Sequence, residues 1–275
     1  MKLLSAITTA AVALSAAEAV LPVNFISFSA DTTEYNGMVF EVRENNENEL
    51  ILTEYGDAKG DVVIPEKIGD CTVTAIGESA FINCRELKTI VIPETVTEIG
   101  LLAFQGCDSL TSVKLPDGLQ VLGNGAFYSC DNLTSITIPE SITTIGNQLF
   151  GLCNSLTSVT LHDGIQSIGW RAFKDCTSLT EIVIPRETTI DDTAFEGANP
   201  ELVIYGYTNS PAQAFAKENS ITFVALDVVK GDMSGDGVVD INDVTDIQKL
   251  MISDEELTEE QISLADVDGD GIVCV

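Results

Sequence analysis

The stretch Leu110-Thr-Ser-Val-Lys-Leu-Pro116, followed by Leu119-Gln-Val-Leu-Gly123 and Ala126-Phe-Tyr-Ser-Cys130, sets the pattern of most of this chain. The same pattern recurs before and after it every 23 residues, as the step from Phe81 to Phe104 illustrates. A fixed period of about 20 to 50 residues is typical of a solenoid, in which each unit buries its apolar positions against its neighbours. We therefore predict a repeat solenoid in which no single coil folds alone.

Three residue types mark equivalent positions in successive coils. The phenylalanines are Phe81, Phe104, Phe127, Phe150 and Phe173. The cysteines are Cys84, Cys107, Cys130, Cys153 and Cys176, and leucines keep the same spacing from Leu87 to Leu202. Side chains at equivalent positions of adjacent coils point the same way, which fits disulfide geometry poorly. We predict that these cysteines are buried thiols and that the phenylalanines fill the space between the layers.

The Leu-x-x-Ile-x-Ile-Pro part of each coil predicts a short strand. Its apolar residues alternate, as at Ile136 and Ile138, which is the period of a strand. Stacked coils then form a parallel sheet, and proline ends each strand because it cannot donate to the ladder. We expect the glycines equivalent to Gly100 and Gly123 at corners with positive φ, and the Ala-Phe pair that follows predicts a helical turn. The expected fold class is a solenoid, mainly β with short helical turns.

Both ends of the solenoid differ from the repeats. Residues 1–30 begin Met1-Lys2 and continue with small and apolar residues, which predicts a secretory signal peptide. Cleavage after Ala19 and cleavage near Ala30 are both compatible with this sequence. Residues 31–61 contain two strand-like runs around a polar turn, so we predict a hairpin that caps the first coil.

The solenoid is predicted over residues 62–226 and includes its C-terminal cap. Ser210-Pro211 is a favourable helix start, with serine as the N-cap and proline at the first helical position. That helix should reach about Glu218, and a last strand should run from Ile221 to Leu226. Residues 227–230 are then a linker.

The repeat consensus, Leu-x-x-Ile-x-Ile-Pro-x-x-Val-x-x-Ile-Gly-x-x-Ala-Phe-x-x-Cys, resembles the BspA-like leucine-rich repeats of bacterial surface and secreted proteins. The resemblance covers about residues 62–202 and implies a leucine-rich repeat solenoid that binds other molecules. The outward strand positions of the central coils carry mostly hydroxyl groups, with Lys114 as the exception, and include Thr137 and Thr160. The predicted binding residues among them are Thr111, Ser112, Thr134, Ser135, Thr157 and Ser158. This row is either a face that binds a protein or glycan, or a solvated surface to which threonine is suited.

Composition and motifs exclude several functions. The formal net charge is −30, so the chain cannot neutralise the phosphates of nucleic acid. No later segment is long and apolar enough for a membrane span after signal removal. The only histidine, His162, replaces a turn proline, and a nucleophilic pair with Cys153 has no further support. We therefore predict that the chain is not an enzyme.

The segment after the linker has the spacing of a calcium-binding loop. From Asp232 to Asp243, oxygen-bearing side chains stand at loop positions 1, 3, 5, 9 and 12, and Gly237 stands at position 6. The predicted Ca²⁺ ligands of this first loop are Asp232, Ser234, Asp236, the carbonyl of Val238, Asp240 and Asp243. A second loop begins in the same way, and its predicted ligands are Asp266, Asp268, Asp270 and Ile272. A helix is expected from Asp243 to Met251.

Paired loops of this kind resemble a type I dockerin, a small α-helical, EF-hand-like calcium module that binds cohesins of a cellulosome scaffold. The resemblance covers residues 231–275, and the second loop stops before its last ligand position, so we expect this module to be incomplete. In the family, loop positions 10 and 11 and the following helix contact the cohesin. The equivalent residues here are Ile241, Asn242, Gln248 and Lys249.

Together these features predict a secreted, extracellular adaptor at the cell surface or in a cellulosome. Its dockerin would bind a cohesin in a calcium-dependent manner, and its repeat face would bind an unidentified protein or glycan. Two alternatives remain: a component of polysaccharide degradation with hydrolase activity, and a surface adhesin.

Overall fold

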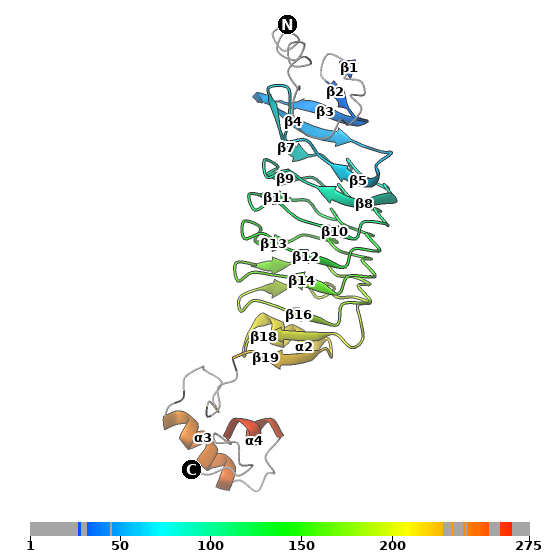
Figure 1. Ribbon diagram of the computed structural model, residues 1–275. Helices are drawn as coiled ribbons and strands as arrows, with labels where there is room; N and C mark the ends of the chain where they lie inside the picture. Colours follow the sequence, from blue (N-terminus) through cyan, green and yellow to red (C-terminus); the bar gives the residue numbers. More distant parts are fainter. Residues whose placement is uncertain are drawn as a thin grey trace.

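The computed structural model describes residues 27–28, 32–44, 46–227, 231, 233, 239, 241–252 and 259–265. Of the predicted signal peptide 1–30, only Ser27–Phe28 fall among these residues, and they form strand β1. Figure 1 shows the repeats as coils stacked one on the next. The predicted solenoid with a parallel sheet is thus confirmed.

The first side of the solenoid is a parallel sheet in the order β14-β12-β10-β8-β5. Its strands are β5 (Lys59–Val63), β8 (Glu86–Val91), β10 (Ser112–Val113), β12 (Ser135–Thr137) and β14 (Ser158–Thr160). Residues one repeat apart lie side by side, since Ser112 pairs with Thr89 in β8 and with Ser135 in β12. Equivalent residues of successive coils therefore form straight rows across the sheet.

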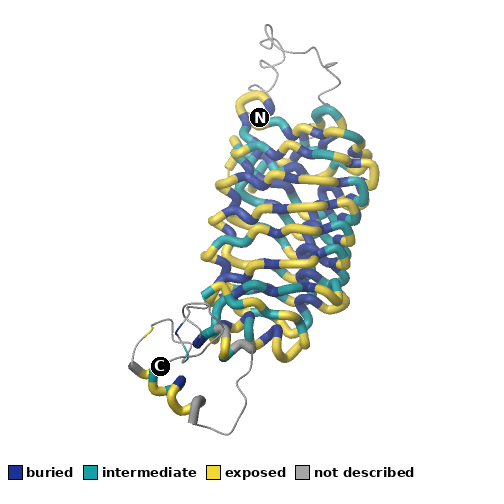
Figure 2. The backbone as a smooth tube through the Cα atoms, turned by 60° about the horizontal axis from the view of Figure 1, so that its bottom comes forward, coloured by how far each residue is buried: buried dark blue, intermediate teal, exposed yellow. Residues whose placement is uncertain are grey.

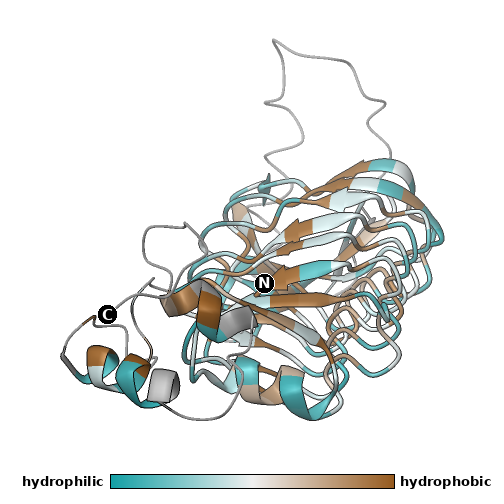
Figure 3. Ribbon diagram, turned by 90° about the horizontal axis from the view of Figure 1, so that it is seen from below, coloured by the Kyte–Doolittle hydropathy of each residue, from teal (hydrophilic) through white to brown (hydrophobic). Residues whose placement is uncertain are grey.

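The second side also carries parallel strands, and all but the first of them are two residues long. These are β7 (Cys71–Ile76), β9 (Glu98–Ile99) and β11 (Val121–Leu122), then β13 (Thr144–Ile145), β15 (Ser167–Ile168) and β17 (Thr189–Ile190). Within a strand such as β13 the exposed Thr144 is followed by the buried Ile145, and Figure 3 shows both hydrophobic (brown) and hydrophilic (teal) residues along the coils. This alternation buries one face of each strand and leaves the other face in water.

The third side is built from stacked turns. The amide of Cys84 donates to the carbonyl of Phe81 at 3.2 Å, and that of Ile82 donates to Ser79 at 3.0 Å. The amide of Phe81 itself reaches into the next coil and donates to the carbonyl of Ala103 at 2.8 Å. The helical turns expected after each glycine are therefore single hydrogen-bonded turns. Backbone bonds join adjacent coils on this side as well.

Antiparallel strands close the N-terminal end. They are β1, β2 (Thr32–Tyr35), β3 (Met38–Arg43) and β4 (Asn46–Glu54), and a short β6 (Lys67–Ile68) folds back on β7. The two strands expected for the hairpin are β3 and β4. Strand β4 pairs in parallel with β7, with Leu50 beside Val73. The hairpin therefore extends the second side of the solenoid.

A strand, a helix and a strand close the other end. They are β18 (Val203–Gly206), α2 (Pro211–Glu218) and β19 (Thr222–Ala225), and β18 pairs with β16 (Glu181–Val183) of the preceding coil. The Ser210 hydroxyl accepts a hydrogen bond from the amide of Gln213 at 3.3 Å, as expected for an N-cap. Two more helices, α3 (Ile241–Ile252) and α4 (Glu259–Ala265), follow in the chain.

The core contains one continuous row of stacked rings. From Phe81 to Phe195, neighbouring ring centroids lie 5.0 to 6.0 Å apart. Tyr55 meets the first ring edge-on, and Phe215 of α2 meets the last at a tilt of 54°. Figure 2 shows buried residues at the same points of successive coils. The two caps thus cover both ends of the aromatic row.

A row of thiols runs beside the rings. Each repeat cysteine is buried and free, and its Sγ donates to a carbonyl of the preceding coil. The acceptor of Cys107 is Phe81 at 3.2 Å, and that of Cys153 is Phe127 at 3.1 Å. The prediction of buried thiols is confirmed. Cysteine suits this position because it packs as a small apolar residue and still supplies a weak donor.

The repeat glycines correct one expectation. Gly100 and Gly123 do not have positive φ. A Cβ atom on Gly123 would lie 2.4 Å from the carbonyl carbon of Gly100, and one on Gly100 would lie 2.7 Å from that of Gly77. These glycines therefore allow the backbones of adjacent coils to approach closely. Positive φ occurs two residues later, at Leu102 and at Gly125, for example.

Candidate functional site

The predicted repeat-face residues lie together on the outer surface of the first sheet. Thr111, Ser112, Thr134, Ser135, Thr157 and Ser158 are all exposed. Ser135 pairs with Ser158 across β12 and β14, so the serines form one row and the threonines a second. We call these six residues the hydroxyl face. It is flat and regular because every coil contributes the same two positions.

The two rows of the hydroxyl face differ in their hydrogen bonds. The hydroxyl of Thr134 donates to the carbonyl of Thr111 at 3.2 Å, and that of Thr157 donates to the carbonyl of Thr134 at 3.1 Å. Each threonine thus reinforces the link to the preceding coil, and its oxygen remains able to accept. Within residues 46–227, the serine hydroxyls of this face make no hydrogen bond to the protein. The serine row is therefore free for a partner, whereas the threonine row is partly structural.

Acidic residues occupy the turns on either side of these strands. Glu94, Asp117, Glu140 and Asp163 are exposed in the turns that follow β8, β10, β12 and β14, and Asp108 and Asp131 lie in the turns that precede β10 and β12. Lys114 Nζ lies 2.7 Å from Glu94 Oε1, and this hydrogen bond lowers the pKa of Glu94. Burial, and secondarily the Asp108 carboxylate, raises the pKa of Asp131. The hydroxyl face is thus bordered by carboxylates.

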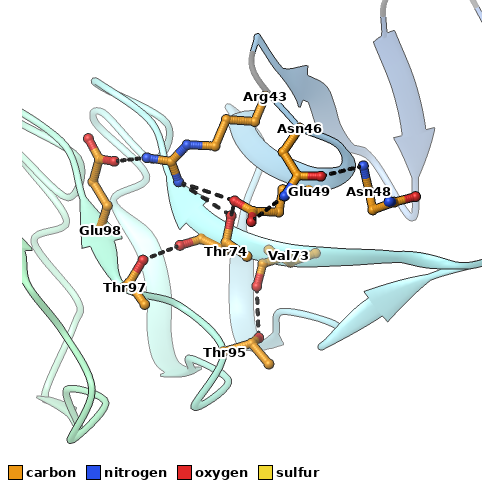
Figure 4. Close-up of polar contacts among 9 residues, drawn as sticks. All are labelled: Arg43, Asn46, Asn48, Glu49, Val73, Thr74, Thr95, Thr97 and Glu98. Atoms are coloured by element: carbon orange, nitrogen blue, oxygen red, sulfur yellow. Dashed lines mark hydrogen bonds and ion pairs between the residues drawn. The ribbon is translucent and has the colours of Figure 1, made fainter.

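A polar cluster joins the hairpin to the first coils, as Figure 4 shows. Arg43 Nη2 of β3 lies 2.8 Å from Glu98 Oε2 of β9, and Arg43 Nη1 lies 3.7 Å from Glu49 Oε2 of β4. The Thr74 hydroxyl of β7 donates to Glu49 Oε2 at 3.1 Å. These groups connect the four strands β3, β4, β7 and β9. We assign the cluster to structure, and no periodic signal in the sequence points to it.

The structure brings no catalytic pair together among the described residues. Cys153 Sγ is buried and bonded to the Phe127 carbonyl. The ring of His162 makes its hydrogen bonds to other groups than Cys153. Its Nδ1 accepts from the amide of Gly164 at 3.1 Å, and its Nε2 lies 2.9 Å from the carbonyl of Ile142. Burial raises the pKa of Cys153 and raises that of Cys176 to about 12. These thiols are protonated at neutral pH and unsuited to nucleophilic attack.

Most of the predicted calcium ligands lie outside the described residues. This holds for Asp232, Ser234, Asp236, Val238 and Asp240, and for Asp266, Asp268, Asp270 and Ile272. Asp243, the last ligand of the first loop, is described in the first turn of α3 and is only 1% exposed. Among the described residues alone, no three metal-ligating side chains gather at one point. The calcium site itself stays a prediction.

One hydrogen bond connects the beginnings of the two predicted loops. The amide of Gly231, one residue before the first loop, donates to the carbonyl of Leu264 in α4 at 2.7 Å. Leu264 stands two residues before Asp266, where the second loop begins. Of the predicted cohesin-binding residues, Ile241 begins α3, and Asn242, Gln248 and Lys249 are exposed on that helix.

Comparison with known proteins agrees with the repeat architecture. The family model for the BspA type leucine rich repeat region matches six copies within residues 74–201. A leucine-rich cell surface protein from Faecalibacterium prausnitzii A2-165 is 29% identical, with a TM-score of 0.51, and the match covers 65% of this chain and 55% of that one. A leucine-rich repeat protein of T. pallidum is 25% identical, with a TM-score of 0.52, and the match covers 68% and 95% of the two chains.

This chain therefore spans just over half of the F. prausnitzii protein, at 55%. No curated protein matches the chain. In the part of the chain that the structure describes, no helix has the length and apolar character needed to cross a membrane. The matched family is defined by its repeats, and its description names no catalytic activity. From the 23-residue register, the stacked coils and these matches, we conclude that the repeats fold as a leucine-rich repeat solenoid, and that residues 74–201 are similar to the BspA type leucine rich repeat region.

Proposed function

We propose that this protein is a secreted, non-catalytic binding protein whose hydroxyl face holds a protein or glycan partner. The observation that carries this proposal is the row of exposed serines on β10, β12 and β14, whose hydroxyls make no hydrogen bond within residues 46–227. The face repeats the same group in register over three coils, and solenoids commonly bind partners on such extended surfaces. The cell-surface description of the F. prausnitzii relative supports an extracellular location.

Blocking this face tests the proposal. Ser135→Trp with Ser158→Trp places two bulky neutral side chains on the face, and Thr144→Trp with Ser167→Trp does the same on the second side, where these residues also pair. We expect the parent and the second-side variant to retain the same partner from culture fluid of the source organism. The face variant should lose that partner. Identical retention by all three proteins, or by none, would contradict the proposal.

We further propose that residues 231–275 attach the protein to a cohesin through bound calcium. The predicted ligands are carboxylate, hydroxyl and carbonyl oxygens, which suit Ca²⁺, and a bound Ca²⁺ would offset part of the local negative charge. Two described features support a paired-loop module. Asp243 is almost fully buried, which is rare for aspartate unless it is paired or ligates a metal. The bond from Gly231 to Leu264 joins residues that lie one and two positions before the two predicted loops in the sequence.

Two double variants separate folding of this module from recognition. Asp232→Ala with Asp236→Ala removes two charged ligands, so cohesin binding should fall below detection because metal binding supplies folding energy to so small a module. Ile241→Asp with Asn242→Asp should keep calcium bound yet weaken the cohesin complex, since loop positions 10 and 11 need not ligate the metal. Calorimetry of the full chain against a panel of cohesins, in millimolar calcium, measures both effects.

The parent protein must first bind at least one cohesin of the panel. Circular dichroism should show that the repeat region stays folded in both variants, because its core does not involve these residues. If both variants bind every cohesin as the parent does, or if the parent binds equally well in EDTA, the attachment role is wrong.

A further inference from the structure

The central coils carry an unusual charge distribution. Between Lys114 and Arg171 the sequence contains no lysine or arginine. The acidic residues in this interval are Asp117, Asp131, Glu140 and Asp163. All four lie in the turns that border the strands of the hydroxyl face.

Within residues 46–227, Asp131, Glu140 and Asp163 have no basic partner, whereas Asp117 interacts with the charge of Lys114. No ion pair involves any of the four in residues 46–227. Towards the N-terminal end of the same sheet the basic residues do form pairs, with Lys59 at 3.5 Å from Glu86 and Arg85 at 3.5 Å from Asp108. Lys114, directly after β10, also pairs with Glu94 and interacts with Asp117. The protein's own cations therefore reduce the potential at the N-terminal end of the face and leave the coils of β12 and β14 negative.

The carboxylates are also close enough to act together. Asp117, Glu140 and Asp163 occupy the same position of successive coils, and neighbouring strands lie about 4.8 Å apart. The Debye length at physiological salt is about 8 Å, so their potentials add at the surface instead of being screened from one another. A cation approaching the centre of the face meets several carboxylates at once.

The hydrogen-bonding groups of the hydroxyl face also favour a cationic partner that is rich in donors. The hydroxyl hydrogens of Thr134 and Thr157 are used by backbone carbonyls, so their oxygens face a partner as acceptors, as the carboxylates do. The outward positions of β10, β12 and β14 carry no aromatic ring on which a sugar could stack. Lysine and arginine supply only donors. The complementary partner is thus rich in donors and positively charged.

We infer that the hydroxyl face binds a polypeptide rich in lysine and arginine, which contacts the serine row and the bordering carboxylates Asp117, Glu140 and Asp163. This inference rests on the proposed function and specifies the chemistry of the partner. A neutral glycan could donate hydroxyl hydrogen bonds to the carboxylate border but would gain no charge attraction from it, and an acidic polysaccharide would be repelled by it.

Charge reversal with a matched control tests the inference. Glu140→Lys with Asp163→Lys changes the border of the face, and Glu78→Lys with Asp192→Lys makes the same change in net charge in the exposed turns of the third side. The probe is a fluorescent twelve-residue peptide of alternating lysine and serine, compared with glutamine-serine and glutamate-serine peptides. Fluorescence anisotropy at physiological salt gives the dissociation constants.

The lysine peptide should bind the parent, and the glutamine and glutamate peptides should not. The face variant should bind it about tenfold more weakly, and the control variant should stay within about twofold, because exposed charges act mainly within a Debye length. Equal weakening in both variants would mean that only the net charge matters, and would overturn the inference. So would an unchanged face variant, or binding of the neutral peptide equal to that of the lysine peptide.

The two proposals can fail separately. If the tryptophan face variant loses a partner from culture fluid and the charge-reversed face variant keeps it, the face binds a partner of other chemistry. The proposed function then stands and this inference falls. All variants should first give the parent's circular dichroism spectrum, which is expected because Glu140, Asp163, Glu78 and Asp192 are exposed and form no ion pair in residues 46–227.

Discussion

Replacing Gly123 by alanine should destabilise the repeat region by about 3 kcal/mol or more, because overpacking against backbone cannot be relieved by a rotamer change. The added Cβ would lie 2.4 Å from the carbonyl carbon and 2.5 Å from the carbonyl oxygen of Gly100. Two coils would have to separate, and their separation would weaken the ladders on all three sides. Urea denaturation followed by far-UV circular dichroism measures the loss.

Gly118 provides the matched control. It also lacks positive φ, and an added Cβ would meet only the Glu94 carbonyl oxygen, at 4.0 Å. Gly118→Ala should therefore leave stability unchanged or raise it by about 0.4 to 1 kcal/mol, through the lower entropy of the unfolded chain. If the two variants are equally stable, close approach of the coils is not the reason for glycine at position 123.

Gly123 also illustrates a limit of sequence reasoning about this fold. The 23-residue register predicts that a glycine recurs at a corner, but positive φ and close backbone approach both favour glycine. Only the structure shows which of these two reasons applies at position 123. The positive φ falls on Leu102, Gln148 and Arg171, where no residue type marks it in the sequence.

What could be predicted depended on short-range periodicity. The strand positions, the Phe and Cys rows, the Ser210 N-cap and helix α2 all follow from local pattern. The contact of Arg43 with Glu98 spans 55 residues between a non-repeating strand and a repeat. No period relates these two positions, so the polar cluster of the N-terminal end could not be foreseen.

The candidate site likewise has features that the sequence predicts and features that only the structure shows. Both rows are exposed, as predicted. The strand period accounts for the serines, which alternate with buried residues such as Val113, whereas the threonines directly precede the strands. The bonds that commit the threonine hydroxyls to the preceding coil depend on the stacking geometry, and the sequence does not indicate them. The calcium ligands follow from loop spacing alone. Except for Asp243, they lie outside the described residues, and the ligand role of all of them, Asp243 included, stays a prediction.

A substitution at the centre of the aromatic row should destabilise the repeat region as much as Gly123→Ala does. Phe127 is fully buried between Phe104 and Phe150, with ring centroids at 5.3 and 6.0 Å. Phe127→Ala should cost about 3 to 5 kcal/mol, the usual range for a buried aromatic residue. Because each coil contacts only its neighbours, the cavity weakens the one interface that joins the two halves of the solenoid. We therefore expect the single urea transition of the parent to broaden or split as well as to shift.

Phe127→Leu separates loss of ring stacking from loss of volume. Leucine keeps most of the buried apolar surface, so this variant should lose about 1 to 2 kcal/mol and retain a single transition. Tryptophan fluorescence adds a local probe, since the only tryptophan, Trp170, lies in the C-terminal half of the repeats. In Phe127→Ala its transition should separate from that of the circular dichroism signal, which reports on all coils. Coincident transitions and a loss below about 1 kcal/mol would show that the core repacks around the missing ring, and that the row of rings is not what couples the coils.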